Sequence, residues 1–458
     1  MATLTRTDIA VIGGGLSASA VIAELVDRLP PSTTIGVVAP KGRRGRGVAY
    51  GTTDDRHLLN VPAGRMSLFS TDPDHFVRWL RQKAAGYGPH DFVPRRIYGD
   101  YVRDSLASAI RRTGNRSAVS FFDAEATGFA ATDEGGYPFR LSNGDVVAGQ
   151  SAVLCVGGAP AGLPLPAGAV DPAVADRLVA DPWKADWIGA IEPDATVLFV
   201  GTGLTMIDQL VSLVGRGHRG PIHAMSRRGL LPHPHREPRP PAVALDLDPA
   251  RDGLAAALSE LRRAAGRIDD WRALMDGLRP STQRLWDGLA PAQRRQFMRH
   301  LLPYWNAHRH RVAPAVNAEV EALRRTGRVH IRAGWLESIT DAGGRARVSF
   351  RPRGTHGLET LTADVVVNCC GPDRCPSLQS SPLLVDLAAR GVVTPDPTGL
   401  GIAVDRDSAV IAADGRRLRG LYAVGPLTAG TFWEITAVPE IRAQAAGVAD
   451  NLARRYAN

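Results

Sequence analysis

Two glycine-containing segments, far apart in the sequence, most constrain the fold of this chain. Residues 9–18 read IAVIGGGLSA and residues 196–205 read TVLFVGTGLT. In each, a β-branched apolar run reaches glycines and continues as a helix-forming stretch of small and apolar residues. A first glycine allows a tight turn, a second lets the backbone approach a pyrophosphate, and a small third residue lets helix and strand pack closely. Both segments therefore predict a strand-turn-helix dinucleotide site.

The two copies support each other, although they are not equally good. Ala18 fills the small third position in the first copy, whereas the bulky Met206 occupies it in the second. A second apolar strand follows each helix, at residues 33–39 and 221–226. Two copies predict two bound nucleotides and a fold of the α/β class with two Rossmann-like domains.

Composition indicates a large enzyme of two or three domains. The chain has 458 residues, of which 44% are hydrophobic, and no apolar run is long enough to span a bilayer. Residues 1–8 are polar and open directly into a strand, so we expect a cytoplasmic protein without a secretion signal. The cysteines, none in C-x-x-C spacing, predict reduced thiols and neither a disulfide framework nor a redox dithiol; they are Cys155, Cys369, Cys370 and Cys375.

Neither nucleic acid nor metal is expected as a partner. The net charge is +9, but arginines are scattered beside acidic residues, and the dense basic run 41–46 directly follows the second strand of the first fold. There it would meet a bound dinucleotide or solvent. His233 and His235, like His308 and His310, are spaced i, i+2, which makes side chains diverge on a helix, and no cysteine or acid completes a site. His308 and His310 would line a pocket with Trp305 or be structural.

Other patterns suggest the chain's organisation. A helix is expected at 72–84, capped by Asp72, and another at 98–112. Strands are expected near 117–124, 137–141, 151–156, 329–333, 345–351, 364–368 and 421–424, and a closing helix near 439–456. A Pro/Gly/Ala-rich link covers 159–169, and a largely helical insertion interrupts the second fold at 253–311.

This layout resembles the two-dinucleotide-binding-domain flavoproteins, in which an inserted NAD(P) domain splits the FAD domain. Five landmarks carry the resemblance: the two glycine turns, the strand ends at 154–158 and 364–371, and residues 421–425. Residues 45–51 (GRGVAYG), 57–67 (HLLNVPAGRMS) and 305–311 (WNAHRHR) resemble a bacterial FAD/NAD(P)-binding family related to the flavin-dependent N-hydroxylating monooxygenases. Cys369-Cys370 departs from the Ala-Thr of those enzymes, which weakens the specific link to N-hydroxylation.

The resemblance implies domain limits and cofactor contacts. The FAD domain would be 1–190 and 364–458, and the NAD(P) domain 191–363, with the helical insertion at about 240–315. Residues expected to contact FAD are Gly13, Gly15, Leu16, Ser17, Ala18, Gly47, Tyr50, Asn60, Val61, Met66, Ser67, Gly157, Gly425, Pro426, Thr436 and Ala437. Those expected at the second nucleotide are Gly201, Gly203, Leu204, Thr205, Ser226, Arg227 and Arg228, and Gly371 is a further expected cofactor contact.

The ends of the second strands predict which nucleotide each fold takes. The first strand ends Ala-Pro-Lys at 39–41 and lacks the usual acid for the adenosine ribose. The second ends Ser226-Arg227-Arg228, and arginine there pairs with a 2′-phosphate, which favours NADPH over NADH. The alternative is that Arg227 and Arg228 are solvated surface.

Two loops are candidates for the reaction site. In residues 59–67, Asn60 would hydrogen-bond the flavin ring edge or nicotinamide and Arg65 would offset the charge of reduced flavin, unless this is a plain structural turn. In residues 431–437, Thr436 and Ala437 would present N–H groups to the flavin O2 edge, beside pocket residues Trp433 and Glu434. Alternatively, Trp433 belongs to the core and Glu434 caps the closing helix.

We therefore expect an NADPH-dependent FAD monooxygenase that uses molecular oxygen, through a flavin hydroperoxide, to hydroxylate a small nucleophile such as an amine. One alternative is an NAD(P)H-dependent flavin oxidoreductase that reduces a quinone or another acceptor without oxygen insertion. The other is a non-catalytic FAD-binding partner or sensor protein, whose motifs would look identical.

Overall fold

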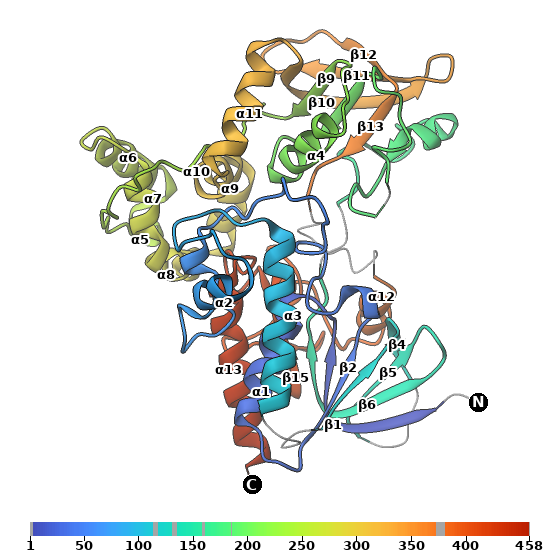
Figure 1. The fold of residues 1–458 in the computed structure, drawn as a ribbon, viewed down its shortest axis with the longest axis vertical. Helices are drawn as coiled ribbons and strands as arrows, with labels where there is room; N and C mark the ends of the chain where they lie inside the picture. The colour runs from blue at the N-terminus through green and yellow to red at the C-terminus, as the bar shows by residue number, and fades with distance from the viewer. Residues whose placement is uncertain are drawn as a thin grey trace. The chain divides into compact units, whose positions relative to one another are not determined.

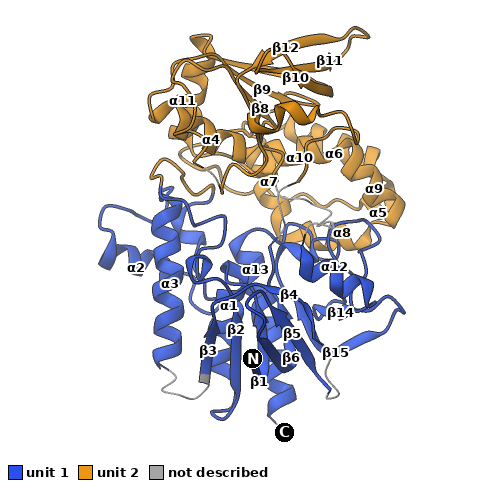
Figure 2. Cartoon of the chain, turned by 90° about the vertical axis from the view of Figure 1, so that its right-hand side faces the viewer, with its two compact units in different colours: residues 1–53, 61–159, 374–458 blue, residues 54–60, 160–373 orange. Residues whose placement is uncertain are grey.

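The computed structural model describes residues 3–112, 118–130, 135–157, 161–184, 186–371 and 381–457. The chain divides into two compact units, each assembled from segments that are separated in the sequence (Figure 2). Unit 1 comprises residues 1–53, 61–159 and 374–458, and unit 2 comprises residues 54–60 and 160–373.

Unit 1 is organised around a largely parallel sheet. Its described strands follow the order β14-β15-β6-β1-β2-β3, with β5 added to β6 and β4 to β5. The apolar β1 runs parallel to β2 on one side and to β6 on the other, so the carboxyl ends of all three meet at one edge. The strands are β1 (Leu4–Ile12), β2 (Thr34–Val38), β3 (Ala118–Phe122), β4 (Ala126–Phe129), β5 (Tyr137–Leu141), β6 (Val146–Leu154), β14 (Ala409–Ile411) and β15 (Arg417–Ala423).

Three long helices of unit 1 lie side by side: α1 (Leu16–Arg28) packs against both α3 (Arg95–Arg112) and α13 (Val438–Tyr456) (Figure 1). Residues 16–26 of α1 are all buried, because neighbours cover the helix on several sides. The other helices are α2 (His75–Lys83) and α12 (Pro382–Ala389), with short 3₁₀ turns at Lys41–Arg43, Ala63–Arg65 and Pro426–Thr428.

Unit 2 contains the second sheet, with the described strands in the order β12-β11-β10-β9-β8-β13-β7. The strands from β10 to β7 are parallel, and β11 and β12 extend the sheet as antiparallel strands. Helix α4 (Leu204–Gly215) follows β8 and α11 (Pro314–Arg325) precedes β10. The strands are β7 (Leu178–Val179), β8 (Val197–Val200), β9 (Ile222–Ser226), β10 (Val329–Asp341), β11 (Ala346–Pro352), β12 (Glu359–Ala363) and β13 (Val365–Asn368).

The predicted helical insertion is present between β9 and α11. It has a small core of its own, in which Leu247, Met275 and Leu278 are buried and Trp271 and Trp305 pack against them. The helices are α5 (Pro249–Asp252), α6 (Leu254–Ala265), α7 (Arg272–Leu278), α8 (Thr282–Gly288), α9 (Pro291–His300) and α10 (Leu302–Arg309), with a 3₁₀ turn at Arg279–Ser281 between α7 and α8. Another 3₁₀ turn, Pro172–Arg177, lies elsewhere in unit 2.

The compact units do not follow the boundaries expected from the sequence. Residues 160–190 lie in unit 2, because the two-residue strand β7 pairs with β13 and Val170 bridges to Ile339. Residues 54–60 also join unit 2: the buried His57 lies 2.7 Å, through Nε2, from Oγ of Ser212 on α4. Such short pairings carry no recognisable sequence pattern.

One predicted helix start is wrong. α2 begins at His75 and has Asp74 at its N-cap, not Asp72. The carboxylate of Asp72 instead pairs with Arg78, and its carbonyl oxygen accepts a hydrogen bond from Ser67. Asp72 therefore makes its contacts outside the N-cap position of α2.

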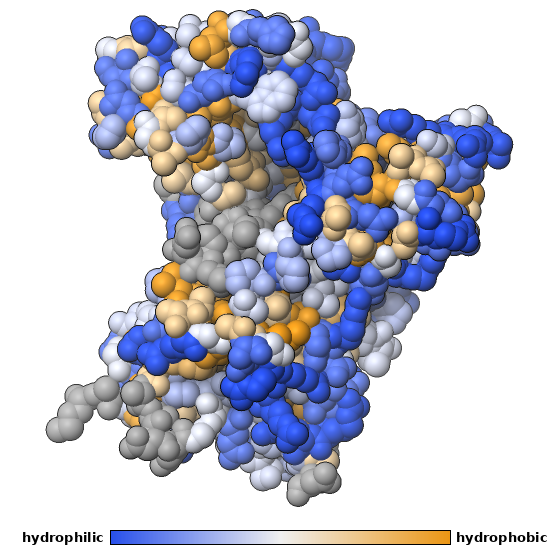
Figure 3. Space-filling view, turned by 180° about the vertical axis from the view of Figure 1, so that it is seen from behind, coloured by the Kyte–Doolittle hydropathy of each residue, from blue (hydrophilic) through white to orange (hydrophobic). Residues whose placement is uncertain are grey.

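Polar and charged residues dominate the surface face in Figure 3, where apolar side chains occur in small groups. Many arginines form ion pairs with nearby carboxylates, as between Arg345 and Asp364 or Arg351 and Glu337. Within the described residues, no helix is both long and apolar enough to cross a membrane.

Candidate dinucleotide-binding sites

The first glycine turn joins β1 to α1 in unit 1. Gly13 has a φ of +123°, and a Cβ atom on it would lie 2.4 Å from the carbonyl oxygen of Cys155, just after β6. The Gly13 N–H donates to the carbonyl oxygen of Val38 at the end of β2, at 2.9 Å. Glycine is required because other residues disfavour this φ and would clash. The turn is thereby fixed where three parallel strands end.

The N-terminus of α1 fits the pyrophosphate of a dinucleotide. Gly15 is the N-cap, so no side chain caps the helix, and the first turn contains no acid. The first N–H groups of a helix have no intrahelical acceptor and lie at the positive end of its dipole. Leu16, Ser17 and Ala18 supply these N–H groups, as the sequence predicts, and phosphate binds well at such a terminus.

Gly425, after β15, lies against this same turn. It has a φ of +90°, and a Cβ atom on it would come within 2.2 Å of Ser17 Oγ. Its N–H donates to Oε1 of Gln444 on α13, at 2.8 Å. Pro426 then begins the next 3₁₀ turn. Residues from both ends of the chain thus meet at the first turn, as the resemblance implies.

The basic loop after β2 crosses the first turn. The Gly45 N–H donates to the Gly14 carbonyl oxygen at 2.8 Å. Gly47 lies against Gly15, because a Cβ atom on Gly47 would be 3.2 Å from Gly15 Cα. The half-buried Tyr50 packs on Tyr98, with ring centroids 4.6 Å apart. A phosphate bound at the turn would therefore lie close to this loop.

An acid missing after β2 is present directly after the neighbouring strand, β3. Val38 of β2 pairs with Phe122 of β3, so Asp123 stands beside the end of β2. Its Oδ1 accepts a hydrogen bond from the Lys41 N–H at 2.6 Å. Asp123 is an exposed carboxylate at the edge where an adenosine ribose would bind. Sequence reasoning missed it because the register of β2 with β3 is not visible in the sequence.

The predicted flavin-side loop 59–67 is divided between the units. Asn60 belongs to unit 2, where its carbonyl oxygen lies 3.0 Å from Nε2 of His235. Val61 and Arg65 belong to unit 1, half-buried and exposed respectively. Their contacts with a flavin or nicotinamide stay predictions.

Met66 and Ser67, from the same loop, are buried in unit 1. The Ser67 hydroxyl donates to the carbonyl oxygen of Asp72 at 2.6 Å, and its own carbonyl oxygen accepts from Arg442 at 2.9 Å. Ser67 therefore holds the loop to α13, the helix that carries Arg442. This structural role accounts for its burial without a cofactor.

The other predicted flavin-side residues lie in a tight turn before α13. The N–H groups of Thr436 and Ala437 both point to the carbonyl oxygen of Glu434, at 2.6 and 3.3 Å, so they already have an acceptor. Glu434 has a φ of +63°, which is uncommon outside glycine. Ala437 is the N-cap of α13, so the alternative that Glu434 caps this helix is wrong. Trp433 is half-buried.

The second glycine turn joins β8 to α4 in unit 2 and repeats the geometry of the first. Gly201 has a φ of +111°, and a Cβ atom on it would lie 2.2 Å from the Cys369 carbonyl oxygen, just after β13. Gly203 is the N-cap of α4, again without a side-chain cap or an acid in the first turn. Leu204 and Thr205 therefore carry first-turn N–H groups of α4, an arrangement that fits a phosphate.

The carboxyl end of β9 carries the three residues predicted to select the nucleotide. Ser226 Oγ lies 2.8 Å from Thr202 Oγ1 and accepts the Gly229 N–H at 3.0 Å, which ties it to the glycine turn. Arg227 is exposed. Arg228 Nη1 donates to the hydroxyl of Tyr304 at 3.0 Å. Within the described residues, neither arginine has a carboxylate at ion-pair distance.

The cysteines at these strand ends are free thiols. Cys155 and Cys369 are buried, and burial raises the pKa of both. Burial also raises the pKa of Cys370 to about 11, which the Arg227 charge opposes. Cys375 and Gly158 lie outside the described residues, and the expected reduced state of the four cysteines stays a prediction.

The two glycines at the strand ends differ in their surroundings. Gly157, after β6, is exposed. Gly371, after β13, has a φ of +83°, and its carbonyl oxygen accepts the Ala161 N–H at 3.0 Å. Neither contact with a nucleotide is tested by this geometry, so both stay predictions.

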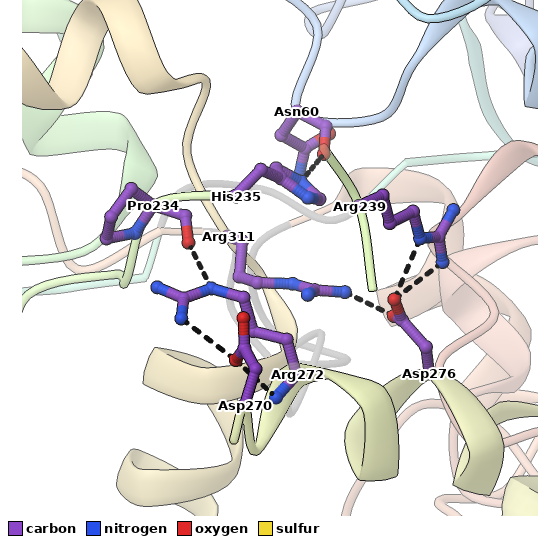
Figure 4. Close-up of polar contacts among 8 residues, drawn as sticks. All are labelled: Asn60, Pro234, His235, Arg239, Asp270, Arg272, Asp276 and Arg311. Carbon is purple, nitrogen blue, oxygen red and sulfur yellow. Dashed lines mark hydrogen bonds and ion pairs between the residues drawn. The ribbon is translucent and has the colours of Figure 1, made fainter. Parts of the chain in front are cut away.

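Ion pairs hold the insertion to its flanking segments within unit 2 (Figure 4). Asp276 on α7 pairs with Arg239 at 2.7 Å and with the buried Arg311. Burial raises the pKa of Asp276, but the guanidinium groups of Arg311 and Arg239 outweigh it and leave that pKa below its usual range. Asp270 forms a second set of pairs, with Arg272 and Arg236.

His308 packs against two other rings, which leaves open whether it lines a pocket. The ring of His308 lies 4.6 Å from that of His233 and 4.7 Å from that of Trp271, between centroids. Trp305 packs instead against Phe297 of the insertion, at 5.9 Å. Across the described ranges, no cluster of histidine, cysteine and acidic residues could hold a metal ion.

Comparison with known proteins agrees with this architecture. Residues 10–159 match the model of a family described as FAD-NAD(P)-binding. The ornithine hydroxylase of Pseudomonas aeruginosa matches with a TM-score of 0.64 and 15% identity, covering 98% of this chain and 99% of that one.

The chain has the fold of the two-dinucleotide-binding-domain flavoproteins. The ornithine N-hydroxylase of Kutzneria sp. 744, solved with reduced FAD, NADP⁺ and L-ornithine, gives a TM-score of 0.61 at 17% identity, covering 98% of this chain and 100% of that one. An uncharacterized protein of Mycobacterium tuberculosis (strain ATCC 25618 / H37Rv) is 22% identical over 528 residues, which cover 99% of this chain and 96% of the relative. The predicted fold class is confirmed.

Proposed function

We propose that the chain is an NADPH-dependent FAD monooxygenase that hydroxylates a small nucleophilic substrate such as an amine. The observation that carries the proposal is the pair of uncapped helix N-termini, each behind a glycine turn, with Arg227 and Arg228 directly after the strand beside the second. Two such phosphate sites fit a flavin and a phosphorylated nicotinamide cofactor. Solved proteins of the same fold are described as ornithine hydroxylases.

Unit 1 would hold FAD and unit 2 would hold NADPH. The N–H groups of Leu16, Ser17 and Ala18 would bind the FAD pyrophosphate, and the exposed Asp123 would accept hydrogen bonds from the ribose. Bound FAD supplies the chemistry of electron transfer and oxygen activation, which no side chain offers. The chain itself supplies binding, orientation and electrostatics.

The second turn would bind the nicotinamide nucleotide in the same way. Leu204 and Thr205 would donate N–H groups to its pyrophosphate, and Arg227 and Arg228 would pair with the 2′-phosphate. Asn60 and Arg65 would orient the nicotinamide and offset negative charge, and Trp433 and Glu434 would face the substrate. These roles are predictions from the sequence and the loops that carry them.

Parallel measurement of NADPH oxidation, oxygen consumption and ¹⁸O incorporation tests the proposal. The enzyme is supplied with a panel of amino acids and diamines, and separately with quinones. We expect one amine to accelerate NADPH oxidation and to yield one hydroxylated product, labelled from ¹⁸O₂, per oxygen consumed. NADPH oxidation by quinones without labelled product would identify a reductase. FAD binding without NADPH oxidation under any condition would leave a non-catalytic protein.

A further inference from the structure

A side chain from the helical insertion contacts the loop that would read the nucleotide. Tyr304 lies on α10, and its hydroxyl accepts a hydrogen bond from Arg228 Nη1 at 3.0 Å. The Arg228 guanidinium carbon also lies 4.8 Å from the centre of the Tyr304 ring. The tyrosine is 42% exposed, so this contact is not a by-product of core packing. A cation and an aromatic face attract at this distance.

The contact stands at the carboxyl edge of the second sheet. Arg228 lies two residues after the end of β9. The side chain of Ser226, the last residue of β9, is hydrogen-bonded to Thr202 of the second glycine turn. Its neighbour Arg227 acts electrostatically on Cys370, beside the end of β13 against which Gly201 packs. Both arginines therefore belong to the edge where a nucleotide bound at the second turn would lie.

Backbone hydrogen bonds fix α10 to the same loop. The His233 N–H donates to the Ala307 carbonyl oxygen at 2.9 Å, and the Val312 N–H donates to the His233 carbonyl oxygen at 3.0 Å. The His235 N–H donates in turn to the Val312 carbonyl oxygen, also at 3.0 Å. The end of α10 is thus tied to the segment that begins with Arg228, which holds Tyr304 beside it.

We propose that Tyr304 is a positioning residue for NADPH: it orients Arg228 so that the guanidinium is ready to bind the 2′-phosphate. The inference rests on the proposed function. Arginine has five N–H donors, and the tyrosine hydroxyl takes one, which leaves donors for the phosphate oxygens. A free arginine must lose rotamer freedom on binding, whereas one already held by Tyr304 loses less. The insertion therefore contributes to nucleotide selection.

Calorimetric binding of NADP⁺ and NAD⁺ to the FAD-loaded protein tests this, because the two ligands differ only in the 2′-phosphate. We expect Tyr304→Ala to weaken NADP⁺ binding about two- to five-fold, as for an exposed cation–π contact, and to leave NAD⁺ binding unchanged. Tyr304→Phe, which keeps the ring, should lose less. The double variant Tyr304→Ala/Arg228→Ala should bind NADP⁺ no more weakly than Arg228→Ala alone, because the tyrosine acts through the arginine.

Trp335→Ala is the matched control, since Trp335 is an aromatic residue of unit 2 with 40% exposure, on β10. It should leave both affinities and the melting temperature unchanged, and a normal melting temperature for Tyr304→Ala excludes unfolding. Unchanged NADP⁺ affinity, an equal loss for NAD⁺, or additive losses in the double variant would overturn the inference. If the unaltered protein binds both ligands equally, the NADPH assignment itself fails, which is a distinct result.

Discussion

Replacing Asp276 by asparagine tests the ion pairs that anchor the helical insertion. The change removes a carboxylate whose side chain is 6% exposed and leaves Arg311, 3% exposed, as a buried charge without its partner. Breaking a buried pair in this way costs about 3–5 kcal/mol. Arg239, the other partner, is 32% exposed and can turn to water, so Arg311 dominates the loss.

The loss should appear locally, because Asp276 joins α7 to Arg239 and Arg311, which lie on either side of helices α5 to α10 in the sequence. At about 1.4 kcal/mol per factor of ten, 3–5 kcal/mol corresponds to roughly two to three and a half orders of magnitude in the opening equilibrium. Hydrogen exchange followed by mass spectrometry measures that opening. We expect amides of α7 and α10 in Asp276→Asn to exchange faster by about this factor, and those of β8 and β9 to change little.

Asp246→Asn is the matched control within the same insertion. Asp246 pairs with Arg284 at 3.3 Å, but its side chain is 94% exposed, so the change should leave exchange as it is. Exchange in α7 and α10 of Asp276→Asn equal to that of the unaltered protein would refute the argument that this buried pair holds the insertion in place.

Three other variants test the nucleotide sites, and a fourth tests a buried histidine. The double change Arg227→Ala/Arg228→Ala should raise the KM for NADPH far more than that for NADH, and equal effects would contradict the 2′-phosphate contact. Gly13→Ala should abolish FAD retention, and Gly201→Ala should abolish NADP⁺ binding while FAD stays bound, because the added Cβ would lie 2.4 or 2.2 Å from a carbonyl oxygen. FAD retention is measured by absorbance and NADP⁺ binding by calorimetry. Intact binding in either variant would contradict the nucleotide site assigned to that turn. Burial, with the nearby Arg311 charge, lowers the pKa of His235 to about 4, so the unfolded chain binds the extra proton first and stability should fall as pH drops from about 6.5 to 4. His235→Gln should make that fall smaller in urea unfolding, and an unchanged fall would argue against burial of the neutral imidazole.

The sequence was sufficient to predict the local features of both sites. The backbone angles of Gly13 and Gly201, and the strand end next to each, require glycine at both positions. This requirement appears in the sequence as the glycine motif. The N–H groups of Leu16 and Leu204 follow from the same motif, because a helix must begin after the turn. The helical insertion was also predictable from its composition.

Contacts between distant segments could not be predicted in this way. Asp123 reaches the end of β2 through strand register, and Tyr304 reaches Arg228 through the fold of the insertion. Neither depends on a local pattern. The Glu434 carbonyl, which takes the N–H groups expected to face a flavin, likewise follows from one unusual backbone angle.

The visible absorption spectrum of the purified protein is the most direct test of whether this chain binds both a flavin and a nicotinamide reductant. It is recorded before and after anaerobic addition of NADPH. We expect the two bands of oxidised flavin, and we expect NADPH to bleach them faster than NADH does. A colourless protein that takes up no FAD when it is supplied would contradict these expectations.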